Sequence, residues 1–191
     1  MKKQNSGPAS TQRDGFTLIE LLVVITIIGI LANIGLNTFT SAQKKSRDAQ
    51  RKGHLKQLKD ALEAYYNDQG EYPDDNASGN IMGCGADALE LCTYGTSSFS
   101  NTTTDTVYMI KMPADPALGS SYYYDAIPNA VGNNSFQLYT RLENTRDIAV
   151  HKDVDDNPQV YDSLNCGTLE CNYGIGSTNI TPEQGRTLTT E

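Results

Sequence analysis

The stretch that decides the fold is Gly15-Phe16-Thr17-Leu18-Ile19-Glu20, which opens an apolar run that continues to Leu36. After Glu20 no charged residue occurs until Lys44. The run is long enough to cross a bilayer, since about 20 residues at a rise of roughly 1.5 Å span a hydrocarbon core of about 30 Å. A glutamate at the start of such a run needs a reason, because acidic residues inside membrane helices are rare and usually paired or functional. The alternative is that Glu20 reaches the headgroups and stays solvated.

The helical pattern extends well beyond this apolar run. No proline occurs between Phe16 and Tyr66, so the spacing predicts one long helix over 16–66. Its second half is amphipathic and should rest on a sheet, with an apolar face of Ala42, Ala49, Leu55, Leu58, Leu62 and Tyr65. Gly70 and Pro73 should end the helix.

Beyond the helix the pattern changes to loops and short strands. Residues 74–104, rich in Asp, Gly, Ser and Thr, predict an irregular loop. Later, tyrosines and β-branched residues alternate with polar ones, which predicts three strands at Thr106–Met112, Ser120–Ala126 and Ser135–Leu142. A tail from about Ile175 should be loosely ordered. These patterns predict an α+β fold: a long N-terminal helix, membrane-spanning in its first half, packed on a small antiparallel sheet with irregular loops.

Charge is segregated along the chain, whose net charge is −8. Residues 44–59 carry seven basic residues and one acid, whereas residues 60–191 carry five basic residues and 20 acids. We expect the acid excess to serve mainly solubility. A second interpretation is that the basic segment of one copy meets an acidic surface of another, which would make assembly sensitive to salt. Basic residues just beyond a membrane helix also meet lipid headgroups more often than nucleic acid.

Four cysteines form two local clusters, Cys84 with Cys92 and Cys166 with Cys171. In an exported domain they should form two disulfides. Of the three pairings that four cysteines allow, we favour the two sequential ones, because short loops close at low entropic cost. A zinc site is the weaker alternative, since neither cluster has C-x-x-C spacing.

One group of carboxylates suggests a metal site. Asp153, Asp155 and Asp156, with Asp162 nearby, could supply several of the six to eight oxygens that calcium binds at about 2.3–2.6 Å. The alternative is an acidic solvated loop, because the spacing does not satisfy the EF-hand pattern. Calcium is therefore the one candidate cofactor.

No motif points to catalysis. His54 and His151 are the only histidines, and neither has metal-ligand spacing. The sequence contains no phosphate loop, no dinucleotide fingerprint and no recognisable pair of nucleophile and base. We therefore expect that the chain is not an enzyme.

The N-terminal stretch resembles the type IV pilin and type II secretion pseudopilin family, whose signature Gly-Phe-Thr-Leu-Ile-Glu is met by Gly15 to Glu20. In that family a membrane-embedded aspartyl protease cuts after the glycine, and the new N-terminal residue is methylated. The resemblance implies a cut between Gly15 and Phe16. It implies a leader at 1–15, a membrane and filament-core helix at 16–38, an amphipathic helix at 39–66 and a globular head at 67–191.

The globular region also resembles part of this family. Gly70-Glu71-Tyr72-Pro73 is similar to the turn that follows the helix in pilins and G-type pseudopilins. The segments Pro113–Pro116 and Tyr122–Tyr124 are partly similar to a region of G-type pseudopilins. Those proteins carry calcium in a C-terminal loop, which favours the metal interpretation of the acidic group.

The resemblance implies a structural subunit that polymerises with itself into a type IV pilus for adhesion, motility or DNA uptake. The alternative within the family is the major pseudopilin of a type II secretion system. An alternative of another class is a monomeric, membrane-anchored binding module. The expected partners are the prepilin peptidase and methyltransferase, the inner-membrane assembly machinery and lipid, with nucleic acid contacted only by the filament. The subunit should sit in the inner membrane with its N-terminus in the cytoplasm, and then in an extracellular or periplasmic filament.

Overall fold

The computed structural model describes residues 15–191, with the side chains of 15–32 and 38–191. It divides into two compact units, Met1–Ser41 and Ala42–Glu191. The predicted leader lies outside the described residues except for Gly15. The elements are α1 (Leu18–Gln69), β1 (Asp74–Asp75), β2 (Ile81–Cys84), the 3-10 helix η1 (Ala86–Ala88), β3 (Glu90–Leu91), β4 (Phe99–Asn101), β5 (Thr106–Met109), β6 (Tyr123–Pro128), β7 (Asn133–Thr140), β8 (Gln159–Tyr161), β9 (Tyr173–Gly176) and β10 (Leu188–Thr190).

The long helix predicted over 16–66 is present as α1, two residues later at its start and three at its end. Gly70 ends it with a left-handed backbone, φ +81°. The Gly70 N–H donates to the Tyr66 carbonyl at 2.8 Å, which satisfies a carbonyl that the helix would otherwise leave open. Pro73 follows three residues later and prevents continuation. The helix therefore ends where its glycine and proline require.

The predicted membrane span stays a prediction. Within the part of the chain that the structure describes, no helix combines the length and the apolarity needed to cross a bilayer. The span was predicted over 16–38, and the side chains of 33–37 lie outside the described residues.

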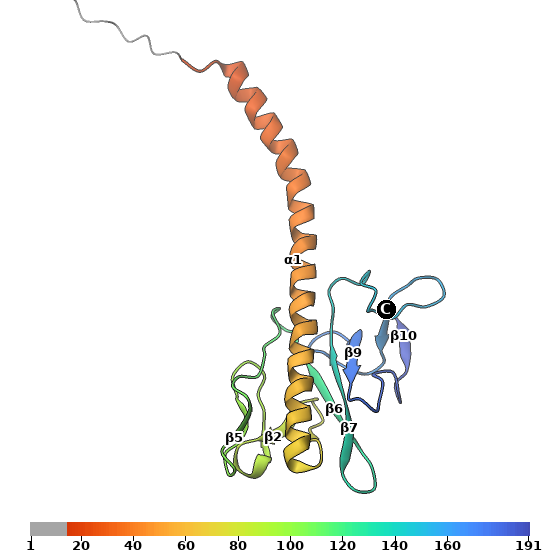
Figure 1. The fold of residues 1–191 in the computed structure, drawn as a ribbon. Coiled ribbons are helices and arrows are strands. Elements are labelled where there is room, and N and C mark those ends of the chain that lie inside the picture. The colour runs from red at the N-terminus through yellow and green to blue at the C-terminus, as the bar shows by residue number, and fades with distance from the viewer. Residues whose placement is uncertain (1–14) are drawn as a thin grey trace, which may run out of the picture. The chain divides into compact units, whose positions relative to one another are not determined.

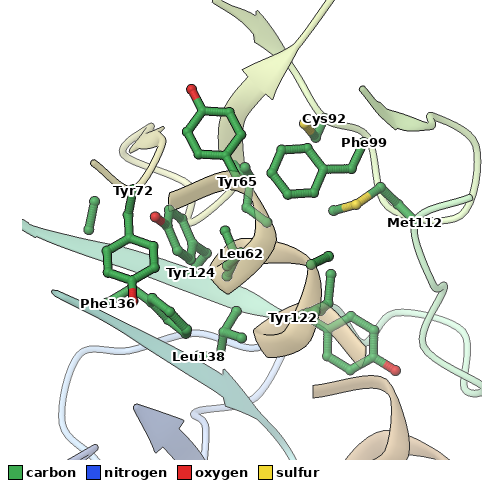
Figure 2. Close-up of a cluster of buried hydrophobic side chains, with 14 of the residues drawn as sticks. Leu62, Tyr65, Tyr72, Cys92, Phe99, Met112, Tyr122, Tyr124, Phe136 and Leu138 are labelled. Carbon is green, nitrogen blue, oxygen red and sulfur yellow. The ribbon is translucent and has the colours of Figure 1, made fainter. Parts of the chain in front are cut away.

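The second unit is built around the C-terminal half of α1 (Figure 1). Leu58 and Leu62 are fully buried, and so are Tyr124 of β6 and Phe136 and Leu138 of β7, which belong to the same core. Figure 2 shows aromatic side chains from the helix end, the sheet and the loops gathered around Leu62. The apolar face predicted for the helix is confirmed from Leu55 onward.

The prediction of that apolar face is wrong at two positions. Ala42 and Ala49 are exposed. The buried positions of this part of α1 are the charged residues Asp48 and Arg51, which are 2% and 0% exposed. Their charged groups pair with each other and with loops far along the chain. The helix therefore contacts its domain here through salt bridges and hydrogen bonds rather than through apolar packing.

Within residues 15–191 the strands form four small antiparallel sheets. The largest paired surface is β6-β7-β9, in which Tyr124 faces Leu138 and Leu138 faces Ile175. Each of the three predicted strands is present, displaced at its ends by up to three residues: β5 stops at Met109, β6 starts at Tyr123 and β7 starts at Asn133. The α+β prediction is confirmed, with several small sheets in place of one.

The segment predicted as an irregular loop, 74–104, contains β1 to β4 and η1. Its strands are only two to four residues long. Such short strands carry little periodicity, so their pairing is set by partners rather than by pattern. The Cys84–Cys92 disulfide closes this region, with the two Cα atoms 5.3 Å apart.

The loosely ordered tail predicted from about Ile175 is wrong, because residues 173–191 are bound to the sheet. The Gln137 side-chain amide donates to the carbonyls of Thr181 at 2.7 Å and Gln184 at 2.9 Å. The Tyr139 hydroxyl donates to the Pro182 carbonyl at 2.7 Å. The last strand, β10, pairs with β8. The tail covers the face of β7 opposite the helix, which explains why nearly every β7 residue is buried.

Candidate functional site

The junction predicted for processing lies directly before α1. Gly15, Phe16 and Thr17 have no regular secondary structure. A Cβ built on Gly15 would meet nothing within 4 Å, and the Phe16 side chain is 85% exposed. The peptide bond between Gly15 and Phe16 is therefore accessible in irregular backbone.

Thr17 and Glu20 form a capping box at the start of α1. The Thr17 backbone N–H and hydroxyl donate to Glu20 Oε2 at 2.8 and 2.7 Å, and the Glu20 N–H donates to the Thr17 hydroxyl at 3.3 Å. This reciprocal arrangement satisfies N–H groups that the first helical turn leaves open. The pattern Thr-x-x-Glu before an apolar run is a known helix-start signature, and the sequence interpretation missed it. Both partners lie after the predicted cut, so processing would leave the capping box in place.

The apolar side chains that follow this capping box are open to the surroundings. Their exposed fractions between Leu18 and Leu31 run from 46% at Val24 to 87% at Leu18. A contiguous apolar surface of this kind marks a protein or membrane contact. The first helical turns are therefore built to be covered by something other than the described part of their own unit.

Four of the seven basic side chains of residues 44–59 are used inside the second unit. Lys52 Nζ lies 2.7 Å from Asp147 Oδ1, and Lys59 Nζ donates to the Gly176 carbonyl at 2.7 Å. The other two are Arg47 and Arg51. The remaining three, Lys44, Lys45 and Lys56, are exposed. The charge that this segment can offer to another molecule is therefore smaller than the sequence suggested.

The buried Arg51 guanidinium holds three carboxylates. Its Nε and Nη2 donate to the two oxygens of Asp115, each at 2.8 Å. Its Nη1 donates to Asp48 Oδ1 and Glu143 Oε1, also at 2.8 Å. Asp48 in turn accepts the backbone N–H groups of Glu143 at 2.9 Å and Asn144 at 2.8 Å. We call these four side chains the Arg51 cluster; it joins α1 to two loops, and sequence reasoning missed it because its loop partners lie 64 and 92 residues from Arg51.

Both predicted disulfides are present. Cys84 is bonded to Cys92 and Cys166 to Cys171, which is the sequential pairing favoured from the sequence. Among the described residues no cysteine is free, so the alternative of a thiolate zinc site has no ligands.

The carboxylates of the acidic loop predicted to bind calcium make local contacts. Asp153 Oδ1 accepts the N–H groups of Asp155 and Asn157, each at 2.9 Å, so it caps its own turn. Asp156 pairs with Lys152 at 2.7 Å. Across residues 15–191 no group of three or more acidic, histidine or cysteine side chains, Asp162 included, is placed to hold a metal ion. Calcium binding here stays a prediction without a preformed site.

Comparison with known proteins defines the family. A family model described as the prokaryotic N-terminal methylation motif matches residues 11–32, which include the junction and the capping box. The type II secretion system core protein G of Pseudomonas aeruginosa is 34% identical over 129 residues, which is 68% of this chain and 82% of that protein. The chain therefore belongs to the type IV pilin and type II secretion pseudopilin family.

Two further relatives match over a shorter part of this chain. The type IV major pilin protein PilA of Myxococcus xanthus is 42% identical over 60 residues, 31% of this chain and 27% of that protein. The fimbrial protein EcpC of Eikenella corrodens is 43% identical over 67 residues, 35% of this chain and 44% of that protein. The chain thus matches less than half the length of these two relatives. No solved structure matches it.

Proposed function

We propose that this chain is a pilin, a structural subunit that polymerises through its N-terminal helix into a type IV pilus filament. The observation that carries the proposal is the exposed apolar surface of the first helical turns, which lies within the residues matched by the methylation motif. Burying apolar surface is worth about 25 cal/mol per Å², so packing these helices against one another would keep their apolar faces out of water once the subunits have left the membrane. Adhesion, motility or DNA uptake would be activities of that filament.

The same surface accounts for the proposed location before assembly. Residues 16–38 would lie in the inner membrane, and Lys2 and Lys3 would keep the N-terminus in the cytoplasm. Cleavage after Gly15 by a prepilin peptidase, with methylation of Phe16, would give the mature subunit. The assembly machinery of the inner membrane would then move it into an extracellular or periplasmic filament. The globular head would lie outside, which suits its two disulfides.

Glu20 would have two roles in this proposal. Within its own helix it completes the capping box through Oε2. In the filament its other oxygen, Oε1, would accept a hydrogen bond from the N-terminal amine of a neighbouring Phe16. An unpaired carboxylate in an apolar core is costly, so this pairing would favour one register of the packed helices.

A second candidate function is the major pseudopilin of a type II secretion system. The observation that favours it is the length of the match to core protein G, which covers 82% of that protein, against 27% and 44% for the two relatives named as pilus proteins. Both functions are structural. The relatives carry names of pilus and secretion components, which fits the expectation of a non-enzyme at a coarse level.

Electron microscopy and intact mass test the proposal together. The chain is expressed with a pilus assembly system, surface material is sheared off, and filaments are imaged. The subunit mass should equal residues 16–191 with one added methyl group. Gly15→Leu should remain unprocessed, whereas Asp14→Asn, a neighbouring change outside the cut bond, should be processed. Filaments that retain residues 1–15 would contradict the proposed cut.

Secretion distinguishes the two candidates. A pilus subunit should give surface filaments with no effect on protein export, whereas a pseudopilin should restore export in a secretion system that lacks its own major pseudopilin. Restoration of export without surface filaments would reverse our order of preference.

A further inference from the structure

A polar hollow in the second unit is lined by residues from the end of α1 and from the turn between β6 and β7. Its volume is about 420 Å³, which falls in the usual range of roughly 300–1,000 Å³ for small-molecule sites. The side chains that matter for its chemistry are Tyr66, Gln69, Glu71, Asn129, Asn133 and Asn134. None of them takes part in the N-terminal motif or in the Arg51 cluster.

Hydrogen bonds of the backbone and of asparagine side chains fix the shape of this hollow. The Tyr72 N–H donates to the Asn133 carbonyl at 2.8 Å, which ties the end of the helix to the start of β7. The Asn133 side-chain amide donates to Asp74 Oδ1 at 2.6 Å. In the turn, Asn129 Oδ1 accepts the N–H groups of Val131 at 2.7 Å and Gly132 at 3.1 Å. The walls are therefore held before any ligand binds.

Gly132 lets Glu71 approach the turn. The backbone of Gly132 has φ +151°, and a Cβ there would lie 2.2 Å from Glu71 Oε2. Any side chain at this position would displace the carboxylate. The glycine thus places an exposed carboxylate directly beside the amide groups of the turn.

The functional groups around the hollow suit a ligand with hydroxyl groups. Asn129 uses its Oδ1 within the turn, which leaves its NH₂ group as a donor, while Asn133 uses its NH₂ group, which leaves its Oδ1 as an acceptor. Glu71 adds two acceptor oxygens. A sugar hydroxyl both donates and accepts, and adjacent hydroxyls can share the two oxygens of one carboxylate.

Tyr66 supplies an apolar wall. Its ring is partly buried against Tyr72, with the ring centroids 4.6 Å apart. An aromatic ring with a polar tip offers a flat surface to the C–H face of a sugar and a hydroxyl at its edge. The ring is held in place by its contact with the tilted Tyr72 ring, so little side-chain entropy would be lost on binding.

The lining also disfavours anionic and aliphatic ligands. No lysine, arginine, histidine or cysteine lines this hollow, all of whose residues are described. Phosphate and carboxylate ligands would therefore meet an uncompensated Glu71, and an aliphatic ligand would bury amide groups without partners. We propose that this hollow binds a neutral saccharide. The inference goes beyond filament formation, because each subunit carries the whole site and its test needs no filament.

The test uses the full-length protein in detergent and an array of neutral oligosaccharides built from hexoses and N-acetylhexosamines, with sialylated glycans and basic peptides on the same array. The wild-type protein should be retained on a subset of these glycans. Titration with a retained glycan should then give a dissociation constant at least tenfold weaker for Glu71→Gln, which replaces one acceptor oxygen by an NH₂ donor and removes the charge with little change in size. Gln69→Ala should also weaken binding. Asp60→Asn is the matched control, since Asp60 is an exposed acid on α1 that does not line the hollow.

Several results would overturn the inference. Retention of no neutral glycan would do so, and so would retention only of sialylated glycans or of basic peptides. Equal dissociation constants for the wild type and Glu71→Gln would place the binding elsewhere. Melting temperatures of the three variants should match that of the wild type, because none of the three side chains is buried. Filament formation by these variants is scored separately, so loss of the pilin function and loss of this site are distinguishable.

Discussion

Replacement of Arg51 by methionine removes the centre of the Arg51 cluster while keeping an unbranched side chain of similar length. The side chains of Asp48 and Asp115 are only 3% and 1% exposed, so water cannot replace the lost guanidinium. We expect Arg51→Met to destabilise the second unit strongly without changing its fold.

The expected cost follows from what each carboxylate keeps. Removing one partner of a buried ion pair usually costs about 3–5 kcal/mol. Asp48 keeps its two backbone N–H donors, and Asp115 keeps the N–H of Ala117 at 2.8 Å. Such bonds stabilise the charged form, so we expect a loss near the lower limit, about 3 kcal/mol. With a urea dependence of roughly 2 kcal/mol per molar, the midpoint should fall by about 1.5 M.

Urea unfolding of the full-length protein in detergent, followed by circular dichroism, measures this change. Arg47→Met is the matched control, because the Arg47 and Glu143 side chains are 30% and 23% exposed and such pairs are worth about 0–1 kcal/mol. If the unfolding free energies of Arg51→Met and Arg47→Met differ by less than about 1 kcal/mol, the Arg51 cluster does not stabilise the domain.

Three further predictions concern assembly, the tail and acid. Glu20→Gln should enter the membrane but assemble poorly, because its neutral amide cannot form an ion pair with a neighbouring amine. The ratio of sheared to membrane-bound subunit measures this, and normal filaments from Glu20→Ala would contradict the pairing. Truncation after Gly185 should lower the urea midpoint, because it removes β10 and the ion pair of Arg186 with Asp125, whereas an unchanged midpoint would mean that the tail contributes nothing. The hydrogen bond from Arg47 lowers the pKa of Glu143 to about 2 from its ordinary 4.5, so the stability it contributes is present above pH 4.5 and is lost as pH falls toward 2. The difference in unfolding free energy between wild type and Glu143→Gln should narrow over that range, and a constant difference would contradict this.

Several features of the protein were predictable because short-range patterns determine them. The apolar run after Gly15 and the absence of proline before Tyr66 were enough to predict α1 to within three residues. The disulfides joined cysteines only eight and five residues apart, where loop closure favours the local pair. The capping box was also readable, since Thr17 and Glu20 are three residues apart, although the sequence interpretation did not use it.

Other features depended on contacts between distant parts of the chain. A tail rich in Thr and Gly carries no pattern that predicts order, yet Gln137, Tyr139 and Arg186 hold it to the sheet. The short strands of 74–104 form only because partners lie beside them. Local propensity is weak in such segments, so tertiary hydrogen bonds decide their structure.

By itself, the sequence determined the N-terminal motif, the long helix, the α+β class and the local disulfides, because each of these depends on residues within a few turns or a short loop of one another. Only the tertiary structure decided that Arg51 is buried among three carboxylates, that four basic residues of α1 are used internally, and that Glu71 meets the turn at Gly132. Ion pairs and hollows of this kind depend on which loops fold against which helix. That choice is made by burial of the whole core, and no local stretch of residues contains it.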